Sequence, residues 1–327
     1  MTGDYAGRRI LVTGASGFLA GSLVHALGDV RCTLVLLTRD AARLAPVAAT
    51  AKIEVQVGDP RAADTWARAL DGVDVVFHFA AQTSVYTADA DIAADVDSNV
   101  RPMVHLLDTC RARGVAPVVL FAGTVTEAGM PERLPVDEGH SDRPITVYDL
   151  HKLIAESYLK SFVDQGLAHG AALRLANVYG PGRRSSSADR GVLNAMVRRA
   201  LAGQPITIYG RGDHVRDYVY VDDVVSAFLQ AGRHIDAVDG RHFVIGSGEP
   251  HTLAQALGLV ADRVAAKTGR RVEVRHVDPP ATLARIETRN FVADVSAFTR
   301  ATGWRPTWSL VEGLDRTIDA FMAEERA

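Results

Sequence analysis

Short blocks of apolar residues alternate with helix-like stretches through the first half of the chain. Five such blocks, rich in β-branched residues, are expected to form buried strands at 10–13, 33–37, 53–57, 73–79 and 118–121. Apolar side chains recur at helical spacing between them, at 20–27, 66–70, 103–113 and 150–162. Continuously apolar strands that alternate with helices predict a doubly wound α/β fold, with one parallel sheet covered by helices on both faces.

The pattern changes after a sixth expected strand at 171–175. Pro181, Gly182 and the polar run at 183–187 predict a loop, and the periodicity beyond it is less regular. We therefore expect a second, smaller lobe to begin there.

This second lobe is expected to be discontinuous. Residues 217–228 again predict a strand followed by a helix, and 243–246 predict a further strand. The expected division is residues 1–176 for the first lobe, with 217–246 and 289–298 returning to it, and 177–327 mainly for the second lobe.

The composition and the distribution of apolar residues exclude several classes of protein. Lys and Arg total 36 against 39 Asp and Glu in 327 residues, so no basic surplus exists to bind nucleic acid. No apolar run approaches the roughly 20 residues that cross a membrane, and residues 1–9 are too polar for a secretion signal. Cys32 and Cys110 fall in apolar segments, as expected of reduced core thiols. We expect a cytoplasmic protein.

A glycine-containing turn follows the first strand. Gly14 permits a tight turn, and Gly17 lets the backbone approach a pyrophosphate at the N-terminus of the next helix. Ala20 occupies the third position of the pattern, where close packing of helix on strand is required. Such a turn also occurs without a ligand, but the strand before it and the helix after it favour a dinucleotide site.

The end of the second strand bears on which dinucleotide binds. Thr38 stands where an acidic residue would bind the adenosine ribose of NAD, and Arg39 can pair with the 2′-phosphate of NADP. NADP(H) is therefore favoured over NAD(H). Asp40 leaves alternatives open, because it could pair with Arg39 in a solvated turn or face the ribose itself. Asp59, at the end of the third strand, could accept from the adenine amino group or cap the following helix.

Tyr148 and Lys152 are candidates for proton transfer. Four residues apart on a helix, they lie on one face. A nearby ammonium stabilises a phenolate, which lets a tyrosine transfer protons closer to neutral pH. Thr124, at the end of the fifth strand, could address the same substrate oxygen. The plainer alternatives are an exposed helix face and a strand-end threonine that bonds local backbone.

These residues form part of a larger pattern, which the chain shares with a known family. The segments are Thr13-Gly14-x-x-Gly17, His78-Phe79-Ala80-Ala81-Gln82, Asn99, Thr124, Tyr148-x-x-x-Lys152, Arg174 to Pro181, Arg216-Asp217-Tyr218 and Thr302-Gly303-Trp304-x-Pro306. Over almost its whole length the sequence resembles extended short-chain dehydrogenases/reductases of the nucleotide-sugar epimerase/dehydratase group. The resemblance implies a Rossmann-type lobe, a smaller C-terminal lobe for a nucleoside diphosphate sugar, and a homodimer through helices near 93–113 and 148–163.

The resemblance also implies roles for particular residues. Tyr148 would be the acid/base, Lys152 the ribose anchor and Thr124 the hydroxyl partner. Expected cofactor contacts are Gly14, Ser16, Gly17, Phe18, Leu19, Arg39, Asp59, Pro60, Phe79, Ala80, Ala81, Tyr148 and Lys152. Expected substrate contacts are Gln82, Thr124, Thr126, Asn177, Arg216 and Arg285, with Arg289 as an alternative to Arg285.

Departures from the family pattern narrow the chemistry. Val125 and Thr126 stand where 4,6-dehydratases carry an Asp-Glu pair and where nucleotide-sugar decarboxylases carry a Glu, so redox chemistry at C4 remains. The Thr38-Arg39 pair favours an NADPH-dependent 4-ketoreductase acting on a 4-keto-6-deoxy nucleotide sugar, and residues 144–152 are similar to such enzymes. The alternatives are an NAD-dependent 4-epimerase and a non-catalytic NADP(H) sensor.

No metal site is expected, because the histidines lack the spacing of zinc ligands. His151 lies next to Lys152 but on a different helix face from Tyr148, and a solvated position is expected for it.

Overall fold

A computed structural model gives the structure of the chain and describes all residues except 1, 46–49, 183–190, 325 and 327. The loop expected at 183–187 lies outside the described residues. Within the described ranges, no helix has the length and apolar character needed to cross a membrane. Cys32 and Cys110 are buried and free, as expected.

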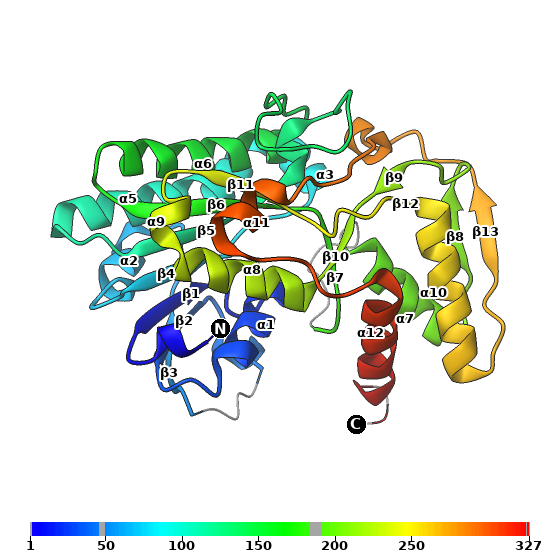
Figure 1. Cartoon of the computed structure of the whole chain (residues 1–327), viewed down its shortest axis with the longest axis horizontal. Helices are drawn as coiled ribbons and strands as arrows, with labels where there is room; N and C mark the ends of the chain where they lie inside the picture. The colour runs from blue at the N-terminus through cyan, green and yellow to red at the C-terminus, as the bar shows by residue number, and fades with distance from the viewer. Residues whose placement is uncertain (1, 46–49, 183–190, 325, 327) are drawn as a thin grey trace.

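A parallel sheet lies in the left half of the molecule as drawn in Figure 1. In the described part of the chain its seven strands run in the order β11-β6-β5-β4-β1-β2-β3. Their bounds are β1 Arg9–Thr13, β2 Thr33–Thr38, β3 Lys52–Val57, β4 Val75–His78, β5 Val118–Thr124, β6 His169–Leu175 and β11 His242–Ile245. The chain winds outward from β1 to β3 and then restarts at β4 on the other side of β1. This reversal confirms the doubly wound fold and opens a crevice at the carboxyl ends of β1 and β4.

Strand β3 differs from the prediction in its burial. Val55 and Val57 are 48% and 59% exposed, whereas the apolar block predicted a buried strand. The reason is position, because β3 is an edge strand and pairs with β2 on one side. An apolar run predicts a strand but does not reveal its place in the sheet order.

Alternate residues of each central strand supply the cores on the two faces of the sheet. Ile10 and Val12 of β1 pack on the face covered by α1 (Phe18–Leu27) and α8 (Val221–Arg233). Leu11 packs on the other face, under α2 (Ala63–Ala69), α5 (Arg101–Arg113) and α6 (Val147–Asp164). This alternation explains why the strands are apolar throughout.

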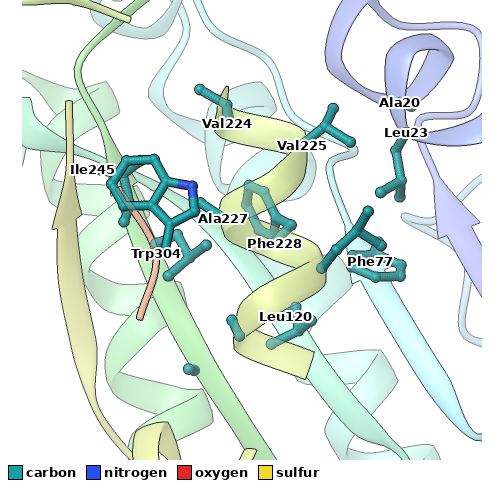
Figure 2. Packing of buried hydrophobic residues seen from close by; sticks show 14 of the residues in the cluster. Ala20, Leu23, Phe77, Leu120, Val224, Val225, Ala227, Phe228, Ile245 and Trp304 are labelled. Carbon is teal, nitrogen blue, oxygen red and sulfur yellow. The ribbon is translucent and has the colours of Figure 1, made fainter. Parts of the chain in front are cut away.

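The α8 face shows how these layers interlock. Phe228 of α8 has its ring centroid 6.4 Å from that of Phe77 and 4.8 Å from that of Phe79. Figure 2 shows Phe228 beside Phe77 and Leu120 of the sheet, with Trp304 on the far side of the helix. The chain around Trp304 therefore returns to the first core long after β6 has ended.

Three short elements link β4 to α5. They are α3 (Val85–Ala90), α4 (Ile92–Asp95) and a π-helical turn (Val96–Val100), labelled η3. Both α4 and η3 pack against α6. This packing brings the segment beside the helix that carries Tyr148.

A second group of elements lies beyond β6, on the right of Figure 1. Its helices are α7 (Val192–Leu201), α10 (Leu253–Thr268) and α12 (Leu310–Glu324), which share one apolar core. Its strands are β7 Asn177–Tyr179, β8 Ile206–Tyr209, β9 Val215–Arg216, β10 Tyr218–Tyr220, β12 His251–Thr252 and β13 Val274–Val277. They form the pairs β7·β10, β8·β13 and β9·β12.

Candidate active site

A cleft of about 1180 Å³ runs along the carboxyl ends of the central strands. Its walls come from the turn after β1, the ends of β2, β4, β5 and β6, the start of α6, and α7. Of the expected cofactor and substrate residues, it is lined by Gly14, Ser16, Gly17, Phe18, Leu19, Arg39, Asp59, Pro60, Phe79, Ala80, Ala81, Gln82, Thr124, Thr126, Tyr148, Lys152 and Asn177.

Gly14 has a left-handed backbone, with φ of +65°. A Cβ on this residue would lie 2.9 Å from the backbone nitrogen of Ala80, so the turn after β1 lies directly against the loop after β4. Gly17 is the N-cap of α1, whose N-terminus faces the cleft. Free amides at a helix N-terminus favour an anionic ligand, which fits a pyrophosphate.

The loop after β4 is held by Thr13, a buried residue that sequence analysis gave no role. Its Oγ1 accepts from the backbone nitrogens of Phe79 (3.1 Å) and Ala80 (3.0 Å). It also lies 2.9 Å from Nδ1 of His78. Burial lowers the pKa of His78 to about 3, and the charge of Lys152 acts in the same direction. His78 is therefore neutral, and its Nδ1 shares a hydrogen bond with the Thr13 hydroxyl.

The turn after β2 is fixed by its own side chains. Thr38 is buried; its hydroxyl donates to the carbonyl of Asp40 (3.0 Å) and accepts from the Asp40 nitrogen (3.2 Å). The carboxylate of Asp40 accepts from the nitrogen of Ala42 (3.0 Å) and so caps the next turn, η2 (Ala41–Arg43). Arg39 lines the cleft.

Two further arginines line this end of the cleft, Arg43 and Arg61. Arg61 binds Asp59 through two nitrogens, with Nη2 2.6 Å from Oδ2, and these hydrogen bonds hold the pKa of Asp59 below its usual value. The N-cap of α2 is Ala62, so Asp59 is not the helix cap that was the plainer alternative. Neither Arg43 nor Arg61 belongs to a recognisable motif, and sequence analysis missed both.

Tyr148 and Lys152 lie in the first two turns of α6, and both are buried. The helix begins after Thr146, whose hydroxyl accepts from the nitrogen of Asp149 (3.2 Å). Thr124 ends β5 and lines the same part of the cleft, with its Oγ1 2.9 Å from that of Thr126. Thr124 also accepts from the Thr126 nitrogen, so it bonds local backbone while lining the cleft.

The charge of Lys152 is set by its surroundings. Its Nζ lies 4.0 Å from the centre of the Phe121 ring. Burial lowers the pKa of Lys152 to about 8, while the carboxylates of Glu127, Glu156 and Asp95 oppose this shift. The ammonium is thus held in a buried position by surrounding negative charge.

A buried cluster of charged side chains holds the backbone of Thr124 in place. Arg174 of β6 contacts Glu127, Glu156 and Asp142, with Nη2 2.7 Å from Glu156 Oε1 and Nε 3.0 Å from Glu127 Oε2. Oε1 of Glu127 accepts from the backbone nitrogen of Thr124 (2.9 Å). Burial, together with the charge of Glu156, raises the pKa of Glu127 well above its usual value. The cluster fixes the carboxyl end of β5.

Two expected substrate residues, Arg216 and Arg285, are not among the described residues that line the cleft. Arg216 is buried and donates to the carbonyls of Val215 (3.1 Å), Glu287 (2.6 Å) and Arg289. The hydrogen bonds of its guanidinium thus go to backbone carbonyls. Arg289 does line the cleft, and its Nη2 donates to Oδ1 of Asn177 (3.4 Å).

His151 contradicts its expected solvated position. It is 5% exposed, and its Nδ1 lies 2.7 Å from Oδ2 of Asp95. The face of α6 that carries His151 is covered by α4 and η3, which the helical pattern of α6 alone could not reveal.

The far end of the cleft is formed by α7 residues that sequence analysis missed. Asn194 bonds both the nitrogen (3.1 Å) and the carbonyl (2.9 Å) of Gly180. Arg198 stacks on the ring of Phe321 at 3.4 Å and pairs with Glu324 at 2.9 Å, so α12 holds it in place. Arg199 and Gln204 complete this wall.

Fold and cleft together define an NAD(P)-dependent enzyme of the short-chain dehydrogenase/reductase class. The glycine turn lies at the reversal point of the sheet, and a buried Tyr and Lys one helical turn apart line the same cleft. The model of the NAD dependent epimerase/dehydratase family matches residues 10–246. The chain belongs to this family, which confirms the resemblance seen in the sequence.

Individual relatives include both epimerases and reductases. UDP-glucose 4-epimerase of Mycolicibacterium smegmatis is 32% identical over 321 residues, 96% of this chain and 98% of that protein. A dTDP-4-dehydro-6-deoxyglucose reductase of Escherichia coli is 27% identical over 249 residues, 75% of this chain and 74% of that protein. The crystal structure of Thermus thermophilus UDP-glucose 4-epimerase in complex with NAD has a TM-score of 0.81 and 30% identity, covering 96% of this chain and 99% of that one.

Proposed function

We propose that the protein is an NADPH-dependent reductase of the C4 ketone of a 4-keto-6-deoxy nucleotide sugar. This proposal rests on the residues at the end of β2. Thr38 offers no carboxylate to a ribose diol, and its hydroxyl is bonded to the turn. Arg39, Arg43 and Arg61 line the same end of the cleft, an arrangement suited to the 2′-phosphate of NADP.

The catalytic roles follow from position in the cleft. The cofactor supplies a hydride when it is bound. Tyr148 donates a proton to the carbonyl oxygen at C4, and Thr124 orients that oxygen. Lys152 holds the ribose beside the nicotinamide and favours release of the proton from Tyr148 through its charge.

The neighbours of Thr124 support a reaction confined to one carbon. Val125 and Thr126 occupy the positions after Thr124, and neither can act as the acid or base of a water elimination. For the diphosphate of the substrate we propose Asn177 and Arg289, in place of Arg216 and Arg285. Both line the cleft, and the planar guanidinium of Arg289 can donate to two phosphoryl oxygens.

A homodimer through α5 and α6 is part of the proposal. Leu150 and Tyr158, both on α6, are 44% and 42% exposed, and a partner subunit on this helix would cover them. We also propose a cytoplasmic location, on the grounds of composition.

A 4-epimerase is the second candidate, because the relatives that match nearly the whole chain include UDP-glucose 4-epimerases. An epimerase keeps NAD bound, oxidises the sugar and returns the hydride to the other face. The two candidates therefore differ in the cofactor that copurifies and in the need for added reductant.

Turnover with purified protein separates these functions. With NADPH and a 4-keto-6-deoxyhexose nucleotide, we expect loss of the absorbance of reduced nicotinamide, and Tyr148→Phe should slow this by about 10²- to 10⁴-fold while leaving cofactor binding intact. Tyr209→Phe, at an exposed tyrosine outside the cleft, is the matched control. Interconversion of nucleotide sugars without added reductant, with NAD released on denaturation, would instead establish the epimerase. Cofactor binding with neither reaction would favour the sensor.

A further inference from the structure

Asp95, the last residue of α4, is a buried hydrogen-bond hub beside the cleft. It is 1% exposed, and its two oxygens accept from three side chains. Oδ2 faces Nδ1 of His151 (2.7 Å), and Oδ1 accepts from Nε2 of Gln82 (2.8 Å) and Nδ2 of Asn99 (2.9 Å). Both carboxylate oxygens of Asp95 are therefore occupied by neighbouring side chains.

Both hydrogens of the Gln82 side-chain amide donate hydrogen bonds within this hub. One bonds Asp95, and the other bonds the carbonyl of Ser84 (2.8 Å), while Oε1 accepts from the Ser84 nitrogen. The Ser84 hydroxyl in turn accepts from the nitrogen of Thr87 (3.2 Å) and caps α3. The bonds that start at Asp95 therefore order residues 82–87, of which Gln82, Thr83 and Thr87 line the cleft.

The same carboxylate is bonded to the catalytic helix. His151 lies three residues after Tyr148 and next to Lys152 on α6. Asp95 thus joins two segments that are far apart in sequence, the helix with the proposed proton donor and the cleft wall at 82–87.

We propose that Asp95 is a positioning residue, which through His151 and Gln82 fixes the cleft wall at 82–87 relative to the helix that carries Tyr148. The kinetic part of this inference rests on the proposed function, because the wall would orient the sugar ring toward the phenol. A misplacement of about 1 Å at such a wall can cost roughly 100-fold in rate.

A second effect of Asp95 is electrostatic. The carboxylates whose charge acts on the pKa of Lys152 are Asp95 from α4, Glu127 from the turn after β5 and Glu156 from α6 itself. The titratable neighbours of Lys152 also include the neutral His78 from β4 and Tyr148, one turn earlier on α6. Each of the three carboxylates raises the pKa of Lys152. Removal of the Asp95 charge should therefore move the alkaline limb of the activity profile to lower pH, which a purely structural role would not do.

The test compares Asp95→Asn, Asp95→Ala and the control Asp97→Asn. Asp97 lies two residues later, in η3, where its side chain is 44% exposed and paired with Arg101 (2.7 Å), so its loss removes equal charge without touching the hub. We expect Asp95→Ala to lower kcat by about 10- to 100-fold with the NADPH dissociation constant unchanged within about twofold. Asp95→Asn keeps the shape and an acceptor oxygen, so it should restore part of kcat and show the shifted alkaline limb.

Hydrogen exchange gives a readout that does not depend on turnover. Amides at 83–88 should exchange faster in Asp95→Ala than in the wild type and Asp97→Asn, with Asp95→Asn between them. If the wild type reduces no nucleotide sugar but this exchange pattern appears, the proposed function fails and the positioning role stands. Unchanged exchange, or kinetics of both Asp95 variants equal to those of Asp97→Asn, would overturn the role of Asp95. If Asp95→Ala does not fold, the amide exchange rates and the pH profile of Asp95→Asn alone decide whether Asp95 has the proposed role.

Discussion

Replacement of Gly14 by Ala tests the contact between the turn after β1 and the loop after β4. The new Cβ would lie 2.9 Å from the nitrogen of Ala80, 3.0 Å from its Cα and 3.1 Å from the carbonyl carbon of Phe79. All three atoms are backbone, so no side chain can rotate away to make room. The loop cannot move freely either, because Thr13 holds it by two hydrogen bonds.

The expected destabilisation has two parts. A left-handed backbone costs an alanine about 1–2 kcal/mol relative to glycine, and forcing a methyl group into a filled space adds about 1–3 kcal/mol. The control Gly269→Ala isolates the first part, because Gly269 has a similar φ of +70° and no atom lies within 4 Å of the place its new methyl group would take. Gly14→Ala should therefore be less stable than Gly269→Ala by about 1–3 kcal/mol.

Urea denaturation of both variants and the wild type measures this difference, and titration with cofactor measures a second consequence. Displacement of the loop by Gly14→Ala should also weaken cofactor binding, whereas Gly269→Ala, at the end of α10, should leave binding unchanged. Equal unfolding free energies for the two variants would refute the argument that close backbone approach explains Gly14.

Two further predictions concern the cofactor and pH. Arg39→Ala should raise the KM for NADPH by roughly 10- to 150-fold, which is the value of one charge-assisted contact, and should leave the KM for NADH unchanged. Steady-state kinetics with both cofactors measures this difference. The control is Arg31→Ala, because Arg31 is exposed and lies before β2. Reduction should be lost as the pH rises through about 8, because burial lowers the pKa of Lys152 to that value and the ammonium is present only below it. A kcat/KM profile that stays flat to well above that pH would contradict the role given to Lys152.

Features set by local sequence were predictable. The glycine turn needs a strand, a left-handed glycine and a helix N-terminus, all contiguous between Arg9 and Leu27. Tyr148 and Lys152 lie on one helix, so their relative placement follows from helical geometry alone. The central strands of the sheet were also predictable from local sequence, because each contributes side chains to a core on both faces and is therefore apolar throughout.

Features set by distant segments were not predictable from a single sequence. The guanidinium of Arg216 is turned toward carbonyls at 287–289, some seventy residues later, so its motif did not fix its direction. His151 is buried by α4 and η3, which approach α6 only through tertiary packing. Strand β3 is the converse case. The sequence predicted this strand correctly but did not show which elements would lie beside it, so the exposure of its residues was not predicted.

The three carboxylates around Lys152 are not equivalent, and this makes Asp95 the informative position. Burial and the charge of Glu156 raise the pKa of Glu127, which biases it toward the neutral form. Burial also acts to raise the pKa of Glu156, but Arg174 and Lys160 outweigh it and bring the value to about 2. Substitution of Glu156 would therefore expose the buried charge of Arg174 and disturb the support of Thr124 at the same time. Asp95 is bonded to His151, Gln82 and Asn99 instead, so Asp95→Asn changes the field at Lys152 while the Arg174 cluster stays intact.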